Sequence, residues 1–545
     1  MFNRLSYFET VTKSQCQMKI NYNSSIIKAL SLSVLIPGNL AMCTRDHAGN
    51  SQPPNILFCI ADDASFHHFG MAGCQWVETP VFDRMASEGV FFNNCYTSNA
   101  KSAPSRASIL TGRYSWQLKE GGNHITNFPS EFKVFTEALS DNDYMVSYTG
   151  KGWAPGNPGM VDGQPRLLTG KHYNKNRTTA PTASMSTEDY VANFIEFLDK
   201  DGSGGKPWFF WFGSREPHRA YEYGSGITLG GKSTDMIDEV PPFWPDTEEV
   251  RTDMLDYAFE IEYFDTQIGK MLDELEKRGM LDNTIIVVTS DNGMPFPRAK
   301  ANNYEYSHHM PLAVMWKDGI YKPGRKINDL VNFVDLAPTF LDAAAIERER
   351  SGMHSSPGKS LLNIFKSRKV GKVDPERSYT LLGRERDDIG RPDNQGYPIR
   401  AIISGDFLYI NNLKSHLMPA GNPETGYLDI DGSPTKTIIL DMMRDGVDSS
   451  YYTLSMGLRP AEELYNLRED SFCVENLAGE EQYAATQKEL RELLYSQLRE
   501  QEDPRVVGGG DIFDRYPYSD PLFWNFYEKV MDGSIKEPWI LTPWV

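Results

Sequence analysis

Runs of consecutive apolar residues are the clearest pattern along the chain. They occupy residues 55–60, 207–212 and 284–289, and each has the length of a single strand. A continuous run of this length is typical of a central parallel strand whose two faces are both covered. The pattern therefore predicts a large sheet that lies buried between layers of helices.

Helical and shorter β patterns alternate with these runs. Residues 79–89 have the amphipathic spacing of a helix, and residues 134–139 predict a second helix that leads into a strand at 145–149. Residues 90–96 predict one short strand. The remaining elements of this part are a strand at 311–316 and a helix at 332–341. Such alternation predicts an α/β fold with a large mixed sheet sandwiched by helices.

The pattern changes near residue 401. Short β segments at 401–404 and 407–410 are followed by a third at 463–467. Residues 480–499 then predict an amphipathic helix. Its apolar residues on or near one face are Tyr483, Leu490, Leu494 and Leu498. We expect a small sheet with this helix packed on it.

The chain divides into three parts on these patterns. Residues 54–400 form the main domain, and residues 401–545 form the smaller C-terminal α+β domain with its tail. Residues 1–53 have the pattern of an export signal: basic residues precede a short apolar core at 29–36, which is too short to span a membrane. We therefore expect a periplasmic or secreted protein with no integral membrane span. Lipid anchoring through Cys43 is left open.

The net charge of the chain argues against some classes of binding partner. The chain has 545 residues and a formal net charge of −19. Such a chain is poorly suited to bind nucleic acid or an anionic membrane surface. An anionic substrate would therefore have to be bound by a local basic pocket.

The six cysteines form neither a zinc cluster nor a disulfide framework by their spacing. Cys16 and Cys43 fall in the leader, and the other four have no CxxC spacing. Cys59 lies in an apolar run and is expected to be a small core residue. A disulfide between Cys74 and Cys95 is left open.

Oxygen-bearing side chains follow two of the apolar runs directly. Asp62 and Asp63 come after the first run, and Asp291 and Asn292 come after the third. Ligand sites of open α/β sheets lie beyond the carboxyl ends of the strands. Oxygen ligands of this kind suit a hard cation such as Ca²⁺. The two strand ends together predict a metal site.

The segment Ser-Ala-Pro-Ser-Arg that begins at Ser102 predicts a loop that runs into a helix. Pro104 suits a first helical turn, and Gly112 is a suitable C-cap. Ser102 then lies at a helix N-terminus, where free N–H groups and the dipole favour negative charge. Arg106 lies about one turn further and reaches the same point. A hydroxyl, a helix start and a guanidinium together predict an anion site with a built-in nucleophile.

The stretch that begins at Ser102 and continues Ala-Ser-Ile-Leu-Thr-Gly-Arg resembles the sulfatase signature, Cys/Ser-x-Pro-x-Arg followed by Leu-Thr-Gly. The resemblance implies an alkaline-phosphatase-like fold. It also implies oxidation of Ser102 to 3-oxoalanine (formylglycine), whose hydrate attacks sulfur. Ser102 matches the serine-type version, which a radical maturase modifies. The Ca²⁺ ligands that the resemblance implies are Asp62, Asp63, Asp291 and Asn292.

Two further strand ends resemble sulfatase motifs. Lys151 matches the lysine of Gly-Lys-x-His, whereas Trp153 replaces the histidine. That replacement leaves open which group helps to expel sulfate, and it suggests that Trp153 stacks on a sugar. His218 matches the histidine that contacts sulfate and the bridging oxygen, so the resemblance implies that it protonates the leaving group.

The region after Asn292 resembles the N-sulfoglucosamine sulfohydrolase branch more than the arylsulfatases. Lys300 best matches the cationic residue that holds sulfate in that branch, and Arg298 is its competitor. Arg219 is a candidate for sugar recognition. The polar loop at 383–400 resembles the same branch, and an exposed ion-pair loop is an equally good interpretation.

The resemblance implies a carbohydrate sulfatase. We expect it to remove an ester sulfate or N-sulfate from a terminal sugar of host glycans, either glycosaminoglycan or mucin-type O-glycan. Sulfated galactose is the alternative to glucosamine as the substrate.

Two other functions are kept as alternatives. A phosphomonoesterase or phosphodiesterase would use unmodified Ser102, but Asn292 speaks against it because zinc-type relatives carry histidine there. An inactive glycan-binding relative is motivated by Trp153 alone.

Overall fold

The computed structural model describes residues 52–536. The predicted export signal and the lipid-attachment candidate Cys43 lie outside the described residues. Within residues 52–536, no helix is long and apolar enough to cross a membrane.

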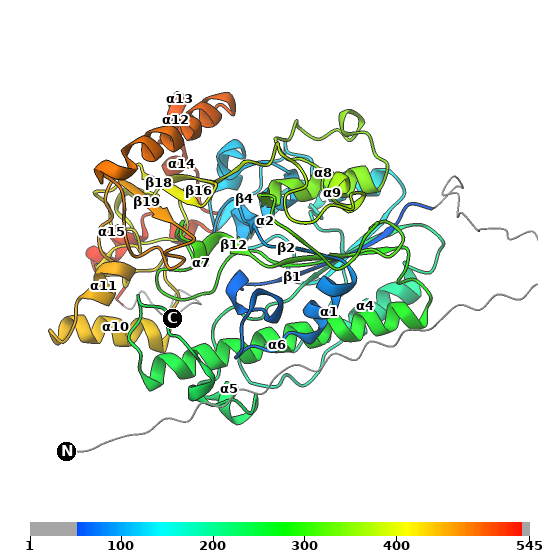
Figure 1. Ribbon diagram of the computed structural model, residues 1–545, viewed down its shortest axis with the longest axis horizontal. Coiled ribbons are helices and arrows are strands. Elements are labelled where there is room, and N and C mark those ends of the chain that lie inside the picture. The colour runs from blue at the N-terminus through cyan, green and yellow to red at the C-terminus, as the bar shows by residue number, and fades with distance from the viewer. Residues whose placement is uncertain (1–51, 537–545) are drawn as a thin grey trace, which may run out of the picture. The chain divides into compact units, whose positions relative to one another are not determined.

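An eight-stranded mixed sheet is the centre of the fold, as the sequence predicts (Figure 1). In spatial order its strands are β14 (Arg325–Ile327), β2 (Val90–Phe92), β13 (Leu312–Met315), β11 (Thr284–Ser290), β1 (Asn55–Ala61), β10 (Trp208–Gly213), β5 (Met145–Gly150) and β9 (Lys171–His172). Strand β1 pairs in parallel with β10 and β11, and β10 pairs in parallel with β5. The carboxyl ends of β1, β5, β10 and β11 therefore meet at one edge of the sheet. Strand β13 pairs antiparallel with both β11 and β2.

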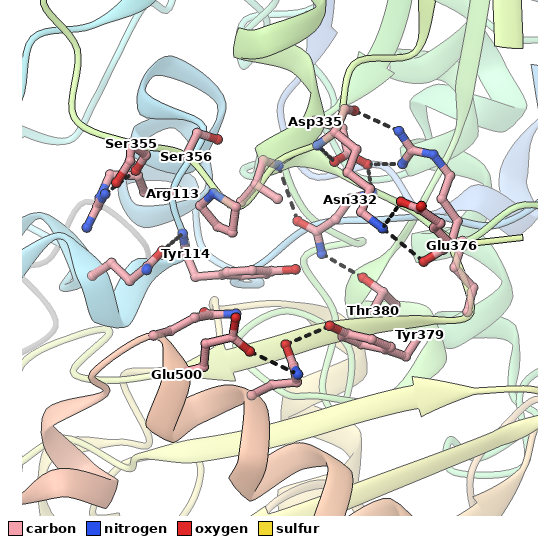
Figure 2. A pocket seen from close by; sticks show the side chains of 18 of the residues that line it. Arg113, Tyr114, Asn332, Asp335, Ser355, Ser356, Glu376, Tyr379, Thr380 and Glu500 are labelled. Atoms are coloured by element: carbon pink, nitrogen blue, oxygen red, sulfur yellow. Dashed lines mark hydrogen bonds and ion pairs between the residues drawn. The ribbon is translucent and has the colours of Figure 1, made fainter. Parts of the chain in front are cut away.

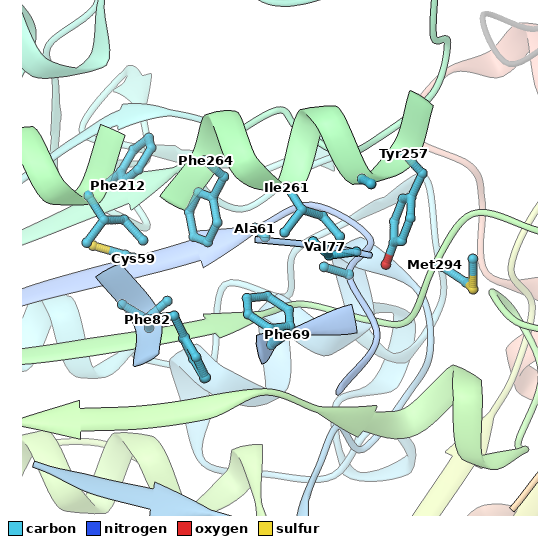
Figure 3. Close-up of a cluster of buried hydrophobic side chains, with 14 of the residues drawn as sticks. Cys59, Ala61, Phe69, Val77, Phe82, Phe212, Tyr257, Ile261, Phe264 and Met294 are labelled. Carbon is cyan, nitrogen blue, oxygen red and sulfur yellow. The ribbon is translucent and has the colours of Figure 1, made fainter. Parts of the chain in front are cut away.

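One face of the sheet packs on three helices, which Figure 1 shows along the same side. They are α1 (Pro80–Glu88), α4 (Tyr190–Lys200) and α6 (Glu248–Lys277). Side chains alternate along a strand, so Leu57 and Cys59 of β1 join this cluster. Figure 3 shows Phe264 and Ile261 of α6 pointing toward β1, with Cys59 in the same cluster.

The opposite face packs on a second group of helices (Figure 1). They are α2 (Ser102–Thr111), α3 (Phe135–Asp141), α8 (Leu336–Ala343) and α9 (Leu362–Phe365). Ile56, Phe58 and Ile60 of β1 join this cluster. Both faces of β1 are therefore covered, which is why its sequence is continuously apolar.

A four-stranded antiparallel sheet follows in the C-terminal part. Its strands are β16 (Tyr379–Arg384), β17 (Ile399–Ser404), β18 (Phe407–Asn412) and β19 (Glu462–Asn466). Helix α12 (Ala484–Glu500) packs on this sheet through Leu490, Leu494 and Leu498, as its pattern predicts. The domain boundary at residue 401 stays a prediction, and β16 lies before it.

Two details differ from the sequence interpretation. The single strand expected at 90–96 is two strands, β2 and β3 (Cys95–Tyr96), and β3 belongs to a small sheet with β12 (His309–Met310) and β15 (Val331–Asn332). No disulfide joins Cys74 to Cys95, because both are free thiols.

Short elements complete the described chain. The helices are α5 (Ser225–Thr228), α7 (Glu305–His308), α10 (Pro434–Arg444), α11 (Ser450–Ser455), α13 (Pro504–Val507), α14 (Ile512–Arg515) and α15 (Phe526–Met531). The strands are β4 (Thr126–Asn127), β6 (Gly156–Asn157), β7 (Met160–Val161) and β8 (Gln164–Pro165).

Candidate active site

The carboxyl ends of four parallel strands bring most of the predicted site residues together. The segment after β1 carries Asp62 and Asp63, and the segment after β11 carries Asp291 and Asn292. Lys151 follows β5, and His218 lies beyond β10. Helix α2 begins at the same place with Ser102.

The turn after β1 lets two adjacent carboxylates serve one site. Consecutive side chains of an extended strand point to opposite faces. Asp63 instead has a φ of 79°, in the left-handed region, and its N–H donates to Oδ1 of Asp291 at 3.0 Å. Carboxylate oxygens of Asp62, Asp63 and Asp291 lie within 4.8 Å of one another.

The hydroxyl of Ser102 is held between two charged groups. It donates to Oδ1 of Asp62 at 3.1 Å and accepts from Nζ of Lys151 at 3.0 Å. One turn further, Oγ of Ser105 donates to the carbonyl of Asp291 at 2.6 Å. The start of α2 is thereby fixed against the end of β11.

Arg106 is fully buried and joins two strand ends. Its Nε donates to Oδ2 of Asp291 at 2.8 Å. Its Nη1 donates to the carbonyls of Lys151 and Gly152, each at 2.9 Å. Because Arg106 is itself fully buried and is held by these bonds, the guanidinium provides a fixed positive charge next to Ser102.

Burial and neighbouring charge set the ionisation of the site. Burial disfavours a charged Asp62, but Lys151 and Arg106 outweigh it and hold the pKa of that carboxyl below its usual value. Burial lowers the pKa of Lys151 and raises the pKa of Asp291. Burial and the neighbouring cations thus act in opposite directions on the pKa values of these carboxyls.

The donor set around Asp63 fits a hard cation. The amide nitrogen of Asn292 donates to Oδ1 of Asp63 at 2.7 Å, whereas its oxygen Oδ1 is buried and has no hydrogen-bond partner. A buried acceptor without a partner is costly. Three carboxylates and this amide oxygen make a ligand set of the kind that Ca²⁺ prefers.

A cavity of about 370 Å³ opens beside this cluster. Asp62, Lys151, Arg215, His218 and Arg219 are among its lining residues. The ring nitrogen Nδ1 of His218 is 2.7 Å from the carbonyl of Arg219, so Nδ1 carries the proton of that hydrogen bond. The other ring nitrogen, Nε2, lies 3.8 Å from Oδ2 of Asp63. His218 therefore presents Nε2 to the site.

Lys300 completes the cluster, in contrast to its competitor Arg298. Nζ of Lys300 lies 2.7 Å from Oδ2 of Asp63 and 2.9 Å from Oδ2 of Asp431. Burial opposes its charge, but Asp431 and Asp63 outweigh burial and raise the pKa of Lys300. Arg298 instead donates to the carbonyls of Leu454 and Cys473, away from the other site residues.

Trp153 has a structural position, which corrects the expectation that it stacks on a sugar. Its side chain is buried, with 8% of the residue exposed. Its indole N–H donates to the carbonyl of Ala103 at 3.0 Å, and its ring packs edge-on against Phe128. Trp153 thus supports the first turn of α2 from the core.

Arg219 lines the cavity, but its guanidinium is engaged within the protein. It forms two hydrogen bonds with Asp253, at 2.6 and 2.8 Å, and its Nε donates to the carbonyl of Pro295. The guanidinium also stacks over Tyr221 and Phe296. This placement speaks against direct sugar recognition by Arg219.

Lys101 is absent from the sequence prediction, and the loop at 383–400 is considered there without the partners of its arginines. Lys101, directly before Ser102, is buried and pairs with Asp388. Arg384 and Arg391 both pair with buried Asp429. The loop at 383–400 therefore has many buried ion pairs, so the exposed-loop interpretation is wrong. The pairs of Arg384 and Arg391 with Asp429 join residues distant in sequence, which no local motif reveals.

A separate cavity of about 490 Å³ contains none of the predicted site residues (Figure 2). It is lined by Arg113 and Tyr114 on one side and by Tyr379 of β16 and Glu500 of α12 on the other. Lys151 and His218 instead line the cavity of about 370 Å³ described above.

Comparisons with known proteins find a matching family model and several similar proteins. A family model described as Sulfatase matches residues 54–346, more than half of the chain. An ulvan-active sulfatase of Formosa agariphila is 28% identical over 477 residues, which cover 81% of this chain and 74% of that protein. The N-sulphoglucosamine sulphohydrolase of Homo sapiens is 25% identical over 518 residues, which cover 87% of this chain and 95% of that protein.

Solved structures share the fold. A protein in complex with its substrate D-glucosamine-2-N,6-O-disulfate superposes with a TM-score of 0.58 at 21% identity, covering 83% of this chain and 99% of that one. A 2-O glycosaminoglycan sulfatase gives a TM-score of 0.58 at 17% identity, covering 86% and 98%. These likenesses establish the α/β architecture with its large mixed sheet.

Proposed function

The chain belongs to the sulfatase family, and from that premise we propose that it removes sulfate from a terminal sugar, with Ser102 as the site of the nucleophile. The observation that carries the proposal is the setting of the Ser102 hydroxyl. It lies between Asp62 and Lys151, beside a cavity that His218 also lines. A tetrahedral anion in that cavity would meet a nucleophile, cations and a proton donor together.

Formylglycine at position 102 is the second part of the proposal. An unmodified serine hydroxyl is a weak nucleophile that needs activation. Oxidation of Ser102 to formylglycine by a radical maturase supplies an aldehyde whose hydrate provides the attacking hydroxyl. The buried position of Ser102 implies that this modification precedes complete folding, since the residue is 2% exposed.

Ca²⁺ is the metal that the donor set favours. We assign Asp62, Asp63, Asp291 and Asn292 as its ligands, and the unpartnered oxygen of Asn292 supports this assignment. A bound Ca²⁺ would stabilise negative charge on sulfate oxygens. All four proposed ligands offer oxygen atoms, which suits Ca²⁺ better than zinc.

The protein's own cations bind and orient the sulfate group. Arg106 is fixed by Asp291 and by two carbonyls, so it holds its charge without rearrangement. Lys151 lines the cavity and reaches Ser102. Lys300 is held by Asp63 and Asp431, from which it presents its ammonium toward the same centre.

His218 is the proposed proton donor to the departing sugar oxygen or nitrogen. The carbonyl of Arg219 fixes the ring through Nδ1. Nε2 is then the atom that faces the reacting centre, and a proton on it can be passed to the leaving group. The ring borders the cavity, where the leaving sugar would lie.

The similar proteins support a proposal for the substrate class. Similar proteins are described as acting on ulvan, on N-sulphoglucosamine and on N-acetylglucosamine 6-O-sulfate. We propose a sulfated terminal sugar of a host glycosaminoglycan or mucin-type O-glycan, with sulfated galactose as the alternative to glucosamine. Export to the periplasm or cell surface would bring the enzyme to such glycans.

A desulfation assay on a defined panel tests the proposal. The full chain, expressed together with a maturase, is incubated with glucosamine N-sulfate, N-acetylglucosamine 6-sulfate and galactose sulfates, and released sulfate is measured. We expect release from at least one of them, and a loss of roughly a thousandfold or more in Ser102→Ala. Ser108→Ala, in the same helix, is the control and should keep activity. Equal sulfate release by Ser102→Ala would overturn the assignment.

A further inference from the structure

A second group of metal-ligating side chains lies outside the proposed Ca²⁺ site. His67, Glu305 and His309 each offer one ligand atom, and these atoms lie within 4.8 Å of one another. His67 belongs to the turn that follows β1, Glu305 is the first residue of α7, and His309 is the first residue of β12. None of the three is among the proposed Ca²⁺ ligands.

Two polar atoms of this group are buried without a partner. They are Nδ1 of His67 and Oε2 of Glu305. Glu305 is 6% exposed, so its second carboxylate oxygen is shielded from water without a compensating hydrogen bond. The buried Oε2 of Glu305 is an acceptor without a partner, which is unfavourable, and a cation bound beside it would satisfy it.

The hydrogen bonds of His309 point to the same conclusion. Its Nε2 lies 2.8 Å from the carbonyl of Asn93, so Nε2 must carry a proton. In the neutral ring Nδ1 then holds a lone pair, and that atom faces Oε1 of Glu305. A shared proton joins these two atoms in this structure, and a metal ion bound by His309 and Glu305 would take the place of that proton.

The aromatic surroundings fix both rings in place. His67 stacks on Tyr306 with ring centroids 4.4 Å apart and planes 4° from parallel. His309 lies between Phe66 at 3.8 Å and Tyr96 at 4.8 Å, with stacked planes on both sides. Both rings are therefore held in fixed orientations next to Glu305.

We propose that His67, Glu305 and His309 bind a divalent cation of the zinc class. Two imidazoles and one carboxylate form a ligand set that zinc favours and that Ca²⁺ does not. Three protein ligands leave a fourth position for water. Glu305 also lines a cavity of about 570 Å³, which provides a path for the ion to enter.

Hydrogen bonds link the proposed zinc site to the loops that carry the proposed Ca²⁺ ligands. Oγ of Ser65 donates to the carbonyl of Tyr306 at 2.6 Å and accepts from the N–H of Met294 at 2.9 Å. The N–H of Gly293 donates to the carbonyl of Ser307 at 2.9 Å. An ion that joins His67 to the segment 305–309 would therefore stabilise the segments that follow β1 and β11.

Zinc titration of the whole protein tests the proposal. The chelator-treated full chain is saturated with Ca²⁺ and titrated with ZnCl₂ by calorimetry, and bound metal is measured by mass spectrometry after buffer exchange. We expect one equivalent of zinc and a rise in melting temperature. Asp291→Asn should keep that equivalent, because Asp291 belongs only to the carboxylate site.

Three variants decide whether the zinc binds at this place. His67→Ala and Glu305→Gln should each weaken zinc binding at least about tenfold and remove the shift in melting temperature. His172→Ala is the matched control, since His172 also stacks on a tyrosine, with 4.3 Å between the ring centroids of His172 and Tyr148. Circular dichroism establishes that each variant is folded. Absence of a zinc equivalent in the wild type, or its retention in both folded variants, would overturn the proposal.

Discussion

The hydroxyl of Ser102 depends on residues from three different segments. Asp62 follows β1, Lys151 follows β5, and both contact the same oxygen at the start of α2. Asp291 then holds the guanidinium of Arg106 beside them. Each residue stands directly after a recognisable strand or in a recognisable motif, which is why the sequence could predict this part of the site.

Asp431 contacts Lys300 at the site, but the sequence could not predict it. It lies in the long connection between β18 and β19, and its carboxylate reaches Lys300 only because the C-terminal part folds over the site. No local pattern distinguishes it from other surface aspartates. Likewise, the sequence could not choose firmly between Lys300 and Arg298. Arg298 has a φ of 67°, and its side chain contacts Leu454 and Cys473 instead.

The role of Asp431 as a positioning residue can be measured. Asp431→Asn removes one of the two carboxylates that hold Lys300, so we expect kcat/KM to fall about tenfold. Lys300→Met should cost more, because it removes the cation and leaves two buried carboxylates unpaired. Steady-state kinetics on the best substrate of the panel gives both values. Wild-type kinetics for Asp431→Asn would mean that Asp63 alone holds Lys300.

The proposed Ca²⁺ ligands can be tested without an activity assay. Ca²⁺ added to chelator-treated protein should raise the melting temperature, because a ligand at about a hundred times its dissociation constant stabilises the folded state by about 2.7 kcal/mol. Asn292→Ala removes the unpartnered oxygen and should reduce this stabilisation. An unchanged response in Asn292→Ala would remove Asn292 from the ligand set.

At the level of elements, the sequence predicts the continuously apolar strands well. It does not predict helix α6. Strand β1 is covered on both faces, so its sequence needs no polar alternation. Helix α6 is 30 residues long, but its buried positions include Asp253, Glu260 and Asp265. The carboxylate of Asp265 accepts the N–H groups of Val81 and Phe82 at the start of α1. Because these polar residues are buried by contacts with other elements, the apolar positions of α6 do not form a clear helical pattern in the sequence.

The contact between Trp153 and the start of α2 can be tested by its effect on stability. Trp153→Phe keeps the ring in the core but removes the hydrogen bond to Ala103, so we expect a loss of about 1 kcal/mol in unfolding free energy. Trp153→Ala should cost about 3–5 kcal/mol, because it leaves a cavity. Urea unfolding measures both changes. A large rise in KM for Trp153→Phe at unchanged stability would restore the sugar-stacking role.

Across the whole molecule, buried neutral histidines make stability depend on pH. Burial lowers the pKa of His68 to about 3 and that of His308 to about 4, against an ordinary value of 6.5. Because the folded-state pKa is depressed, the unfolded chain binds protons first as the pH falls. Their contribution to stability is therefore complete above pH 6.5 and is lost as the pH falls from 6.5 to about 4 for His308 and to about 3 for His68.

The pH dependence of the unfolding free energy should have a measurable slope. Each such histidine contributes about 1.4 kcal/mol per pH unit between its two pKa values. The unfolding free energy of the wild type should fall steeply from pH 6.5 to pH 5, and His308→Gln should make the slope shallower. An identical slope in the variant would show that His308 is not neutral in the folded protein.

The central claim is that Ser102 is converted to formylglycine in a sulfatase site. Mass spectrometry of the peptide that contains Ser102, taken from protein made in its native host, tests this most directly. We predict a peptide lighter by the mass of two hydrogen atoms, because oxidation turns the hydroxymethyl group into an aldehyde. Unmodified serine in a host that has the maturase, in protein that still releases sulfate, would contradict the account.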